Sequence, residues 1–114
     1  MIEMKLVVIE SPYSSRNGNT VEENVAYARA AMHDSIHRGE APLASHLLYT
    51  QPGILDDDIP SERDLGMNAG WQWMAFASLV VVYEDYGITG GMQAGIDKAI
   101  FYKIPVEYRK INAL

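Results

Sequence analysis

Two short polar segments hold most of the residue types that could bind or transform a small molecule. The first, residues 11–19 (SPYSSRNGN), follows an apolar run and combines hydroxyls, amides and one arginine, Arg16. Hydroxyl and amide groups suit ribose or base edges, and a guanidinium suits a phosphate. The same composition also fits a polar loop that only turns the chain, so both interpretations stay open.

The second segment, residues 84–92 (EDYGITGGM), follows the apolar run LVVVY. Gly90 and Gly91 would let backbone amides approach a ligand closely, and Thr89 is a candidate N-cap for a helix. The spacing is neither G-x-G-x-x-G nor a P-loop, because the glycines are adjacent and no Gly-Lys-Ser/Thr follows. A turn needed only for tight strand-to-helix packing is the alternative.

Three acids at predicted strand ends, Glu10, Glu84 and Asp85, are the weak candidates for a catalytic role. A carboxylate there could serve as a nucleophile or a general base, and the sequence establishes neither. His33 and His37 have a metal-compatible spacing but lack the H-E-x-x-H pattern. We expect no metal and no cofactor, with the acidic run 56–58 in a solvated loop.

Composition limits the function classes. The chain has 114 residues, 48% hydrophobic and 21% charged, which fits one soluble domain over residues 1–114. The net charge is −6 and no lysine- or arginine-rich run occurs, so a nucleic-acid polymer is not the expected partner. No cysteine is present, which excludes disulfides and thiol catalysis. The apolar stretch 65–83 is interrupted by Asn68 and Gln72, so we expect no membrane span and a cytoplasmic location.

The pattern alternates strands and helices. Strands are predicted at 5–10, 45–50, 79–84 and 105–111, with helices from about Val21 to Gly39, from Ser61 to about Ala77, and after the glycine turn. Thr20 and Glu23 form a predicted capping box, and the first helix has an apolar stripe of Val21, Val25, Ala28, Met32 and Ile36.

This alternation predicts an α/β fold of flavodoxin-like or Rossmann-like type, a three-layer sandwich. We expect a four-stranded parallel sheet in the order 2-1-3-4, with a ligand crevice at its switch point. Both polar segments would open into that crevice. The second helix has more apolar residues than one sheet-facing stripe needs, which favours a homo-oligomer, a dimer or higher. These residues are Met67, Trp71, Trp73, Met74 and Phe76.

Several short motifs together resemble the nucleoside 2-deoxyribosyltransferase-like superfamily: IESPYS, ERDLG, and GITGGM before a helix ending in alanine. The chain is most similar to small, largely uncharacterised members from bacteria and phages. The resemblance covers essentially the whole chain. It implies a nucleoside or nucleotide at the crevice, with a neighbouring subunit often completing the site. Enzymes of that superfamily cleave or exchange N-glycosidic bonds through a glutamate in the third helix.

Carried onto this chain, the resemblance matches the first-loop positions to Tyr13 and Ser14, and the acid after the third strand to Glu84 or Asp85. The turn falls on Gly90, Gly91 and Met92, and the catalytic glutamate falls on Gly95, four residues before Ala99. Glycine has no side chain with which to attack. The resemblance therefore predicts the fold and the ligand class, with the usual nucleophile missing.

The first hypothesis is that the protein binds, and sequesters, a nucleotide or nucleoside-derived molecule, a signalling nucleotide in the host cytoplasm if the protein is phage-encoded. An N-glycosidase or deoxyribosyltransferase using a displaced carboxylate is the second hypothesis, and a structural module with a vestigial pocket is the third. Tyr13 would stack on or hydrogen-bond the ligand, and Arg16 would bind phosphate. The full set of expected ligand-binding residues is Ser11, Pro12, Tyr13, Ser14, Ser15, Arg16, Asn19, Glu84, Asp85, Thr89, Gly90, Gly91, Met92 and Gly95.

Overall fold

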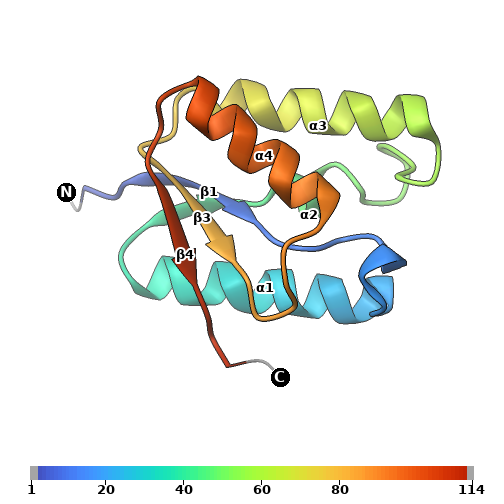
Figure 1. The fold of residues 1–114 in the computed structure, drawn as a ribbon, viewed down its shortest axis with the longest axis horizontal. Helices are drawn as coiled ribbons and strands as arrows, with labels where there is room; N and C mark the ends of the chain where they lie inside the picture. Colours follow the sequence, from blue (N-terminus) through green and yellow to red (C-terminus); the bar gives the residue numbers. More distant parts are fainter. Residues whose placement is uncertain (1–2, 113–114) are drawn as a thin grey trace.

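The centre of the molecule is a parallel four-stranded sheet, seen in a computed structural model that describes residues 3–112 (Figure 1). The sheet order is β2-β1-β3-β4, which confirms the predicted order and fold class. Neighbouring strands are in parallel register, with Val8 opposite Leu43 on one side and Val80 on the other. The strands are β1 (Leu6–Glu10), β2 (Ala41–Leu43), β3 (Leu79–Tyr83) and β4 (Val106–Arg109).

Helices cover both faces of this sheet, so the three-layer prediction is confirmed (Figure 1). Side chains alternate along the strands: Val7 and Ile9 pack toward α1, whereas Val8 and Val80 pack toward α3 and α4. The helices are η1 (Ser15–Asn17), α1 (Val21–His37), α2 (Ser45–Leu48), α3 (Pro60–Met74) and α4 (Gly90–Phe101). Within the described residues, no helix has the length and apolar character needed to cross a membrane.

Helix α1 begins where its capping box predicts. The Glu23 amide donates to the Thr20 hydroxyl, and the Thr20 amide donates to the Glu23 carboxylate. The predicted apolar stripe is wrong in part, because Ile36 is 51% exposed. The buried face instead contains two polar residues, Asn24 and Ser35. Their side chains form hydrogen bonds with residues outside the helix.

The prediction of a strand at 45–50 is wrong. The second strand, β2, lies earlier, and residues 45–48 form the one-turn helix α2, in which the Tyr49 amide donates to the Ser45 carbonyl. Gly39 has a φ of +85°, which turns the chain directly from α1 into β2. Pro42 is tolerated in β2 because that strand is at the edge of the sheet. The correction places His46 on a helix rather than in the sheet.

Helix α3 starts at Pro60, one residue before the predicted cap at Ser61, and ends at Met74. Its first position is a proline, which costs no hydrogen bond at the start of a helix. Helix α3 packs closely on α2, since an ideal Cβ on Gly70 would lie 2.5 Å from the Ser45 hydroxyl. This contact holds α2, and hence His46, close to α3.

Candidate functional site

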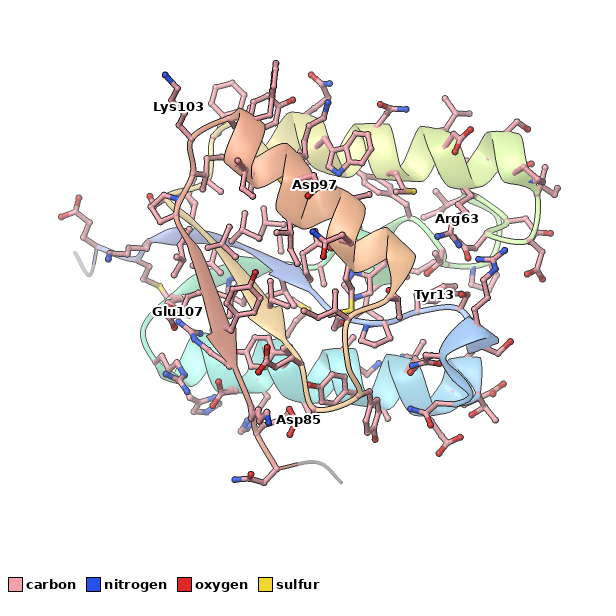
Figure 2. All side chains as sticks on the ribbon, in the orientation of Figure 1. Tyr13, Arg63, Asp85, Asp97, Lys103 and Glu107 are labelled. Atoms are coloured by element: carbon pink, nitrogen blue, oxygen red, sulfur yellow. The ribbon has the colours of Figure 1, made fainter. Side chains whose placement is uncertain are left out.

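A cavity of about 320 Å³ lies at the carboxyl ends of β1 and β3, at the switch point of the sheet. Both polar loops contribute to it, as do α2, α3 and the first turn of α4. Figure 2 shows two of the lining residues, Tyr13 and Arg63, on the same side of the molecule between α3 and the loop after β1. The main polar lining residues are Glu10, Ser11, Tyr13, Ser14, Arg16, Ser45, His46, Asp57, Arg63 and Thr89.

Glu10 is the last residue of β1 and points toward the α4 side of the sheet, where it meets Gly95. An ideal Cβ on Gly95 would lie 2.7 Å from Oε1 of Glu10, and closer still to its Cδ and Oε2. The Glu10 side chain is half-buried, and within residues 3–112 its carboxyl forms no hydrogen bond or ion pair. Its burial raises the pKa of Glu10 to about 8. The cavity therefore contains an acid that is mostly protonated at neutral pH.

Ser11 and His46 form a second polar pair in the cavity lining. The Ser11 hydroxyl and Nε2 of His46 share a hydrogen bond of 2.7 Å. Burial lowers the pKa of His46 to about 4, so its ring is neutral at pH 7. A neutral ring and a hydroxyl can each donate or accept one hydrogen bond to a ligand. His46 was not among the predicted site residues, because the wrong prediction of a strand at 45–50 placed it within the sheet.

The loop after β1 is held in place by Asn24 of α1, which is fully buried. Its amide donates to the carbonyl oxygens of Tyr13 (3.1 Å) and Ser14 (3.0 Å), and it exchanges hydrogen bonds with the Asn17 side chain. The backbone of the loop is thus fixed in front of the cavity, with Tyr13 and Arg16 presented to it. An asparagine in the middle of an otherwise apolar helix face was the signal that could have found this residue.

Positive charge gathers at one wall of the cavity. Nη2 of Arg63 lies 3.2 Å from an ideal Cβ on Gly91, so the glycine lets the guanidinium approach the first turn of α4. Nη1 of Arg63 also lies 3.6 Å from the Asp57 carboxylate. A guanidinium beside a helix N-terminus, with Arg16 in the same lining, is an arrangement that favours an anionic group. Arg63 belongs to the ERDLG motif but was not among the predicted ligand-binding residues.

Thr89 caps α4 as predicted: its hydroxyl accepts from the Met92 amide at 3.3 Å. That amide is therefore engaged within the helix, whereas Gly90 and Gly91 have no intrahelical partner for their amides by position. The first turn of α4 contains no acidic residue. The turn is accordingly available to a ligand through two glycine amides.

Two of the predicted acids lie outside the cavity lining. Asp85 accepts a hydrogen bond of 2.6 Å from the Tyr27 hydroxyl and one of 2.9 Å from the Ile111 amide, which ties Ile111 to α1. Figure 2 shows Asp85 beside α1 and the end of β4, away from Tyr13 and Arg63. The Glu84 amide donates to the Arg109 carbonyl, and its side chain does not line the cavity. Of the three candidate acids, Glu10 alone reaches it.

Four other predicted residues are not among those that line the cavity. Pro12 is fully buried, Gly95 lies in α4 against the Glu10 carboxyl, and the Asn19 amide donates to the Asn17 side chain. Ser15 lines a neighbouring groove. That groove is larger, about 610 Å³, and carries the acids Asp56, Asp57, Asp58 and Glu62. Functional sites concentrate perturbed pKa values, and Glu10 and His46 both lie in the smaller cavity, so we place the candidate site there.

No cluster of three or more potential metal ligands occurs in the part of the chain that the structure describes. The rings of His33 and His37 stack on each other 4.0 Å apart on the exposed side of α1. Asp56 accepts from the Asp58 amide, a local loop hydrogen bond.

The strand order and the cavity together define a doubly wound α/β protein, flavodoxin-like in architecture, with a candidate small-molecule site at its topological switch point. Residues 5–109 match the model of a family described as a domain of unknown function (DUF7768), and the chain belongs to that family. No curated protein and no solved structure matches the chain. The resemblance to the nucleoside 2-deoxyribosyltransferase-like superfamily is not tested by this match and stays a prediction.

Proposed function

We propose that the protein binds a nucleotide or a nucleoside-derived small molecule in the switch-point cavity. The observation that supports this most strongly is the convergence of an aromatic ring, two arginines and a helix N-terminus on one cavity of about 320 Å³. That volume lies within the range of roughly 300–1,000 Å³ of small-molecule sites. The lining also has a separate group for each part of a nucleotide: cationic side chains for the phosphate, hydrogen-bonding side chains for the sugar and an aromatic ring for the base.

In this proposal the phosphate lies between Arg63 and the glycine amides of α4, with Arg16 nearby. Guanidinium groups and free backbone amides both bind phosphate oxygens. Tyr13 stacks on or hydrogen-bonds the base, and Ser11 and His46 bind neutral polar groups of the sugar or base. Sequestration follows from binding without turnover, as the missing helix glutamate at Gly95 implies under the resemblance.

A homo-oligomer is part of the same proposal. Three large aromatic side chains lie outside the core of the described structure: Trp73 (55% exposed) on α3, Phe76 (79%) just after α3, and Phe101 (76%) on α4. Large exposed aromatic side chains of this kind favour a contact with another copy of the chain. Light scattering during size-exclusion chromatography tests this, and a monomer at micromolar concentration contradicts it.

A second candidate function, N-glycosidic bond cleavage, is favoured by one observation: the Glu10 carboxyl fills the space beside Gly95. An acid mounted on β1 could replace the one missing from α4. Its raised pKa leaves little carboxylate at neutral pH, however, and a nucleophile must be ionised. Binding is therefore the better-supported function, and a structural module with an unused pocket is the third alternative.

The test is a panel of ribo- and deoxyribonucleoside 5′-monophosphates and the matching nucleosides. Isothermal titration measures affinity, and chromatography after incubation detects free base. We expect binding without release of base. Release of base supports the glycosidase, and neither binding nor release contradicts both ligand hypotheses.

A matched pair of variants locates the site. Arg63→Ala should weaken binding of the monophosphates by about tenfold or more, as expected for a lost hydrogen bond to a charged group. It should leave nucleoside binding nearly unchanged. Arg38→Ala removes the same charge from the far end of α1, where Arg38 pairs with Asp34 on the surface, and should change neither affinity.

A further inference from the structure

Glu10 faces the cavity without a partner, although ionisable groups from several surrounding elements line the same space. None of them is within hydrogen-bonding or ion-pairing distance of its carboxyl, within residues 3–112. Helix α4, which packs against Glu10 at Gly95, contributes no charged side chain to the cavity lining. The other ionisable groups of the lining are Tyr13 and Arg16 from the first loop, His46 from α2, Asp57 from the loop before α3, and Arg63 from α3.

An ionised carboxylate in this half-buried position would lose part of its hydration without gaining a cation or a hydrogen-bond donor, which is unfavourable. The neutral acid avoids that cost, in agreement with the raised pKa of Glu10. A protonated carboxyl presents one donor and one acceptor side by side in a single plane. It can therefore bind a neutral group that carries an acceptor next to a donor.

Gly95 determines where this carboxyl can lie. Any side chain on Gly95 would overlap the carboxyl carbon and both of its oxygens. Gly95 is buried in the middle of α4, where glycine weakens a helix by roughly 1 kcal/mol relative to alanine. A glycine at this cost is explained by the space that it leaves for Glu10.

We infer that Glu10 recognises the ligand as an uncharged acid, donating one hydrogen bond and accepting another, and that Gly95 provides the space this requires. The inference rests on the proposed function and adds the chemistry of the ligand: a neutral edge with adjacent acceptor and donor. A base edge or a pair of sugar hydroxyls would supply it. Glu10 thus determines specificity and carries no charge in the bound state.

Glutamine separates this role from that of a carboxylate, because its amide also presents a donor beside an acceptor. With the nucleoside monophosphates above as probes, Glu10→Gln should retain wild-type affinity at pH 7, while Glu10→Ala should lose it by about tenfold or more. If Glu10→Gln binds as weakly as Glu10→Ala, the charged form is required and the inference is overturned.

The pH dependence gives a second readout. With a pKa of about 8, only about a tenth of Glu10 is protonated at pH 9, so the wild-type affinity should fall about tenfold between pH 7 and pH 9. Glu10→Gln cannot titrate there and should keep its affinity, apart from any change shared through the ligand. Equal pH profiles for the two proteins contradict the inference.

Gly95→Ala tests the pair without removing a functional group. The added methyl group displaces the Glu10 carboxyl, so affinity should fall as it does in Glu10→Ala. Gln93→Ala, on the exposed side of the same helix, is the control and should bind normally. Wild-type affinity in Gly95→Ala shows that the position of the carboxyl does not matter and overturns the inference.

Two further arms complete the design. Ribose 5-phosphate shows the same Glu10 dependence if the recognised edge is a pair of sugar hydroxyls, and lacks it if the edge belongs to the base. A wild-type protein that binds none of the probes contradicts the proposed function and removes this inference with it. A wild-type protein that binds them, with Glu10→Ala unaffected, contradicts the inference alone.

Discussion

The carboxyl group of Glu10 occupies the space in which a side chain at position 95 would lie. The two residues come from β1 and α4, 85 positions apart in the chain, and each is explained by the other. The Glu10 carboxyl needs a residue without a side chain on the facing helix, and Gly95 meets that need. The cavity at the switch point therefore contains a carboxyl that belongs to the strand rather than to the helix.

Exchanging the residues at positions 10 and 95 should restore part of the stability that Gly95→Glu alone removes. Gly95→Glu alone forces two acids into one space and should destabilise the fold by about 1–3 kcal/mol. The double variant E10G/G95E relieves this overlap, so its free energy of unfolding should exceed that of Gly95→Glu. Urea unfolding of the four proteins in the cycle measures the coupling, expected at roughly 0.5–3 kcal/mol. Additive effects on the free energy of unfolding would contradict direct overlap.

The same double variant also tests turnover. Release of free base by the double variant, but not by the wild type, would show that the acid must be on α4 for turnover.

The stability of the ligand-free protein should depend on the protonation of Glu10. Its folded-state pKa is raised from 4.5 to about 8, so the folded state binds a proton that the unfolded state has released. Stability is therefore lost as the pH rises from about 4.5 to about 8, by at most about 1.4 kcal/mol per pH unit. Glu10→Gln should be similar to the wild type at pH 5 and more stable at pH 8.5, measured by guanidinium unfolding. Parallel stability profiles would show that Glu10 is ionised at neutral pH.

A buried ion pair on the α1 side of the sheet should matter in the opposite pH range. Nη1 and Nη2 of Arg109 donate to the two Glu40 oxygens at 2.8 and 2.7 Å, and both residues are nearly inaccessible. Arg109 lowers the pKa of Glu40, so this pair contributes stability above pH 4.5 that is lost as the pH falls further. Glu40→Gln removes the buried one of the two acids that pair with Arg109 and leaves only the half-exposed Glu107, so it should cost up to about 3–5 kcal/mol at pH 7. The exposed Arg38–Asp34 pair is the comparison: Arg38→Ala should cost no more than about 1 kcal/mol. Similar costs for both variants would contradict this account.

Asn24 should affect ligand binding although it does not line the cavity. Asn24→Ala leaves the Tyr13 and Ser14 carbonyls without their donor and should cost about 1–3 kcal/mol of stability. The released loop should weaken binding of nucleoside monophosphates several-fold. Asn68→Ala is the matched control, because its amide donates to the Asp64 carbonyl on the exposed side of α3. Equal affinities in the two variants would show that the loop needs no anchor.

Much of the fold could be predicted because its signals are local. The apolar runs at β1 and β3, the Thr20–Glu23 capping box and the Gly90–Gly91 turn each specify an element, and connection rules then give the sheet order. The segment 45–50 failed because a four-residue helix has no period to detect, and HLLYT has the composition of a strand. The actual strand, β2, has three residues and a proline.

The position of the cavity could be predicted from the sequence, whereas its side-chain contacts could not. Topology brings the loops after β1 and β3 together, and Tyr13, Arg16, Gly90 and Gly91 line the cavity between them. The contact between Glu10 and Gly95 depends on the position at which α4 packs along β1, and no local sequence pattern specifies that position. Asp85 was indistinguishable from a ligand-facing acid until its hydrogen bond with Tyr27 placed it on the α1 side.

The most direct measurement of the central claim is a backbone amide NMR titration of the protein with deoxyribo- and ribonucleoside 5′-monophosphates. The account predicts saturable shifts confined to Glu10, Ser11, Tyr13, Gly90 and Gly91, because these amides surround the switch-point cavity. Shifts confined to residues 53–58 of the acidic groove, or no shifts at millimolar ligand, would contradict a nucleotide site in this cavity.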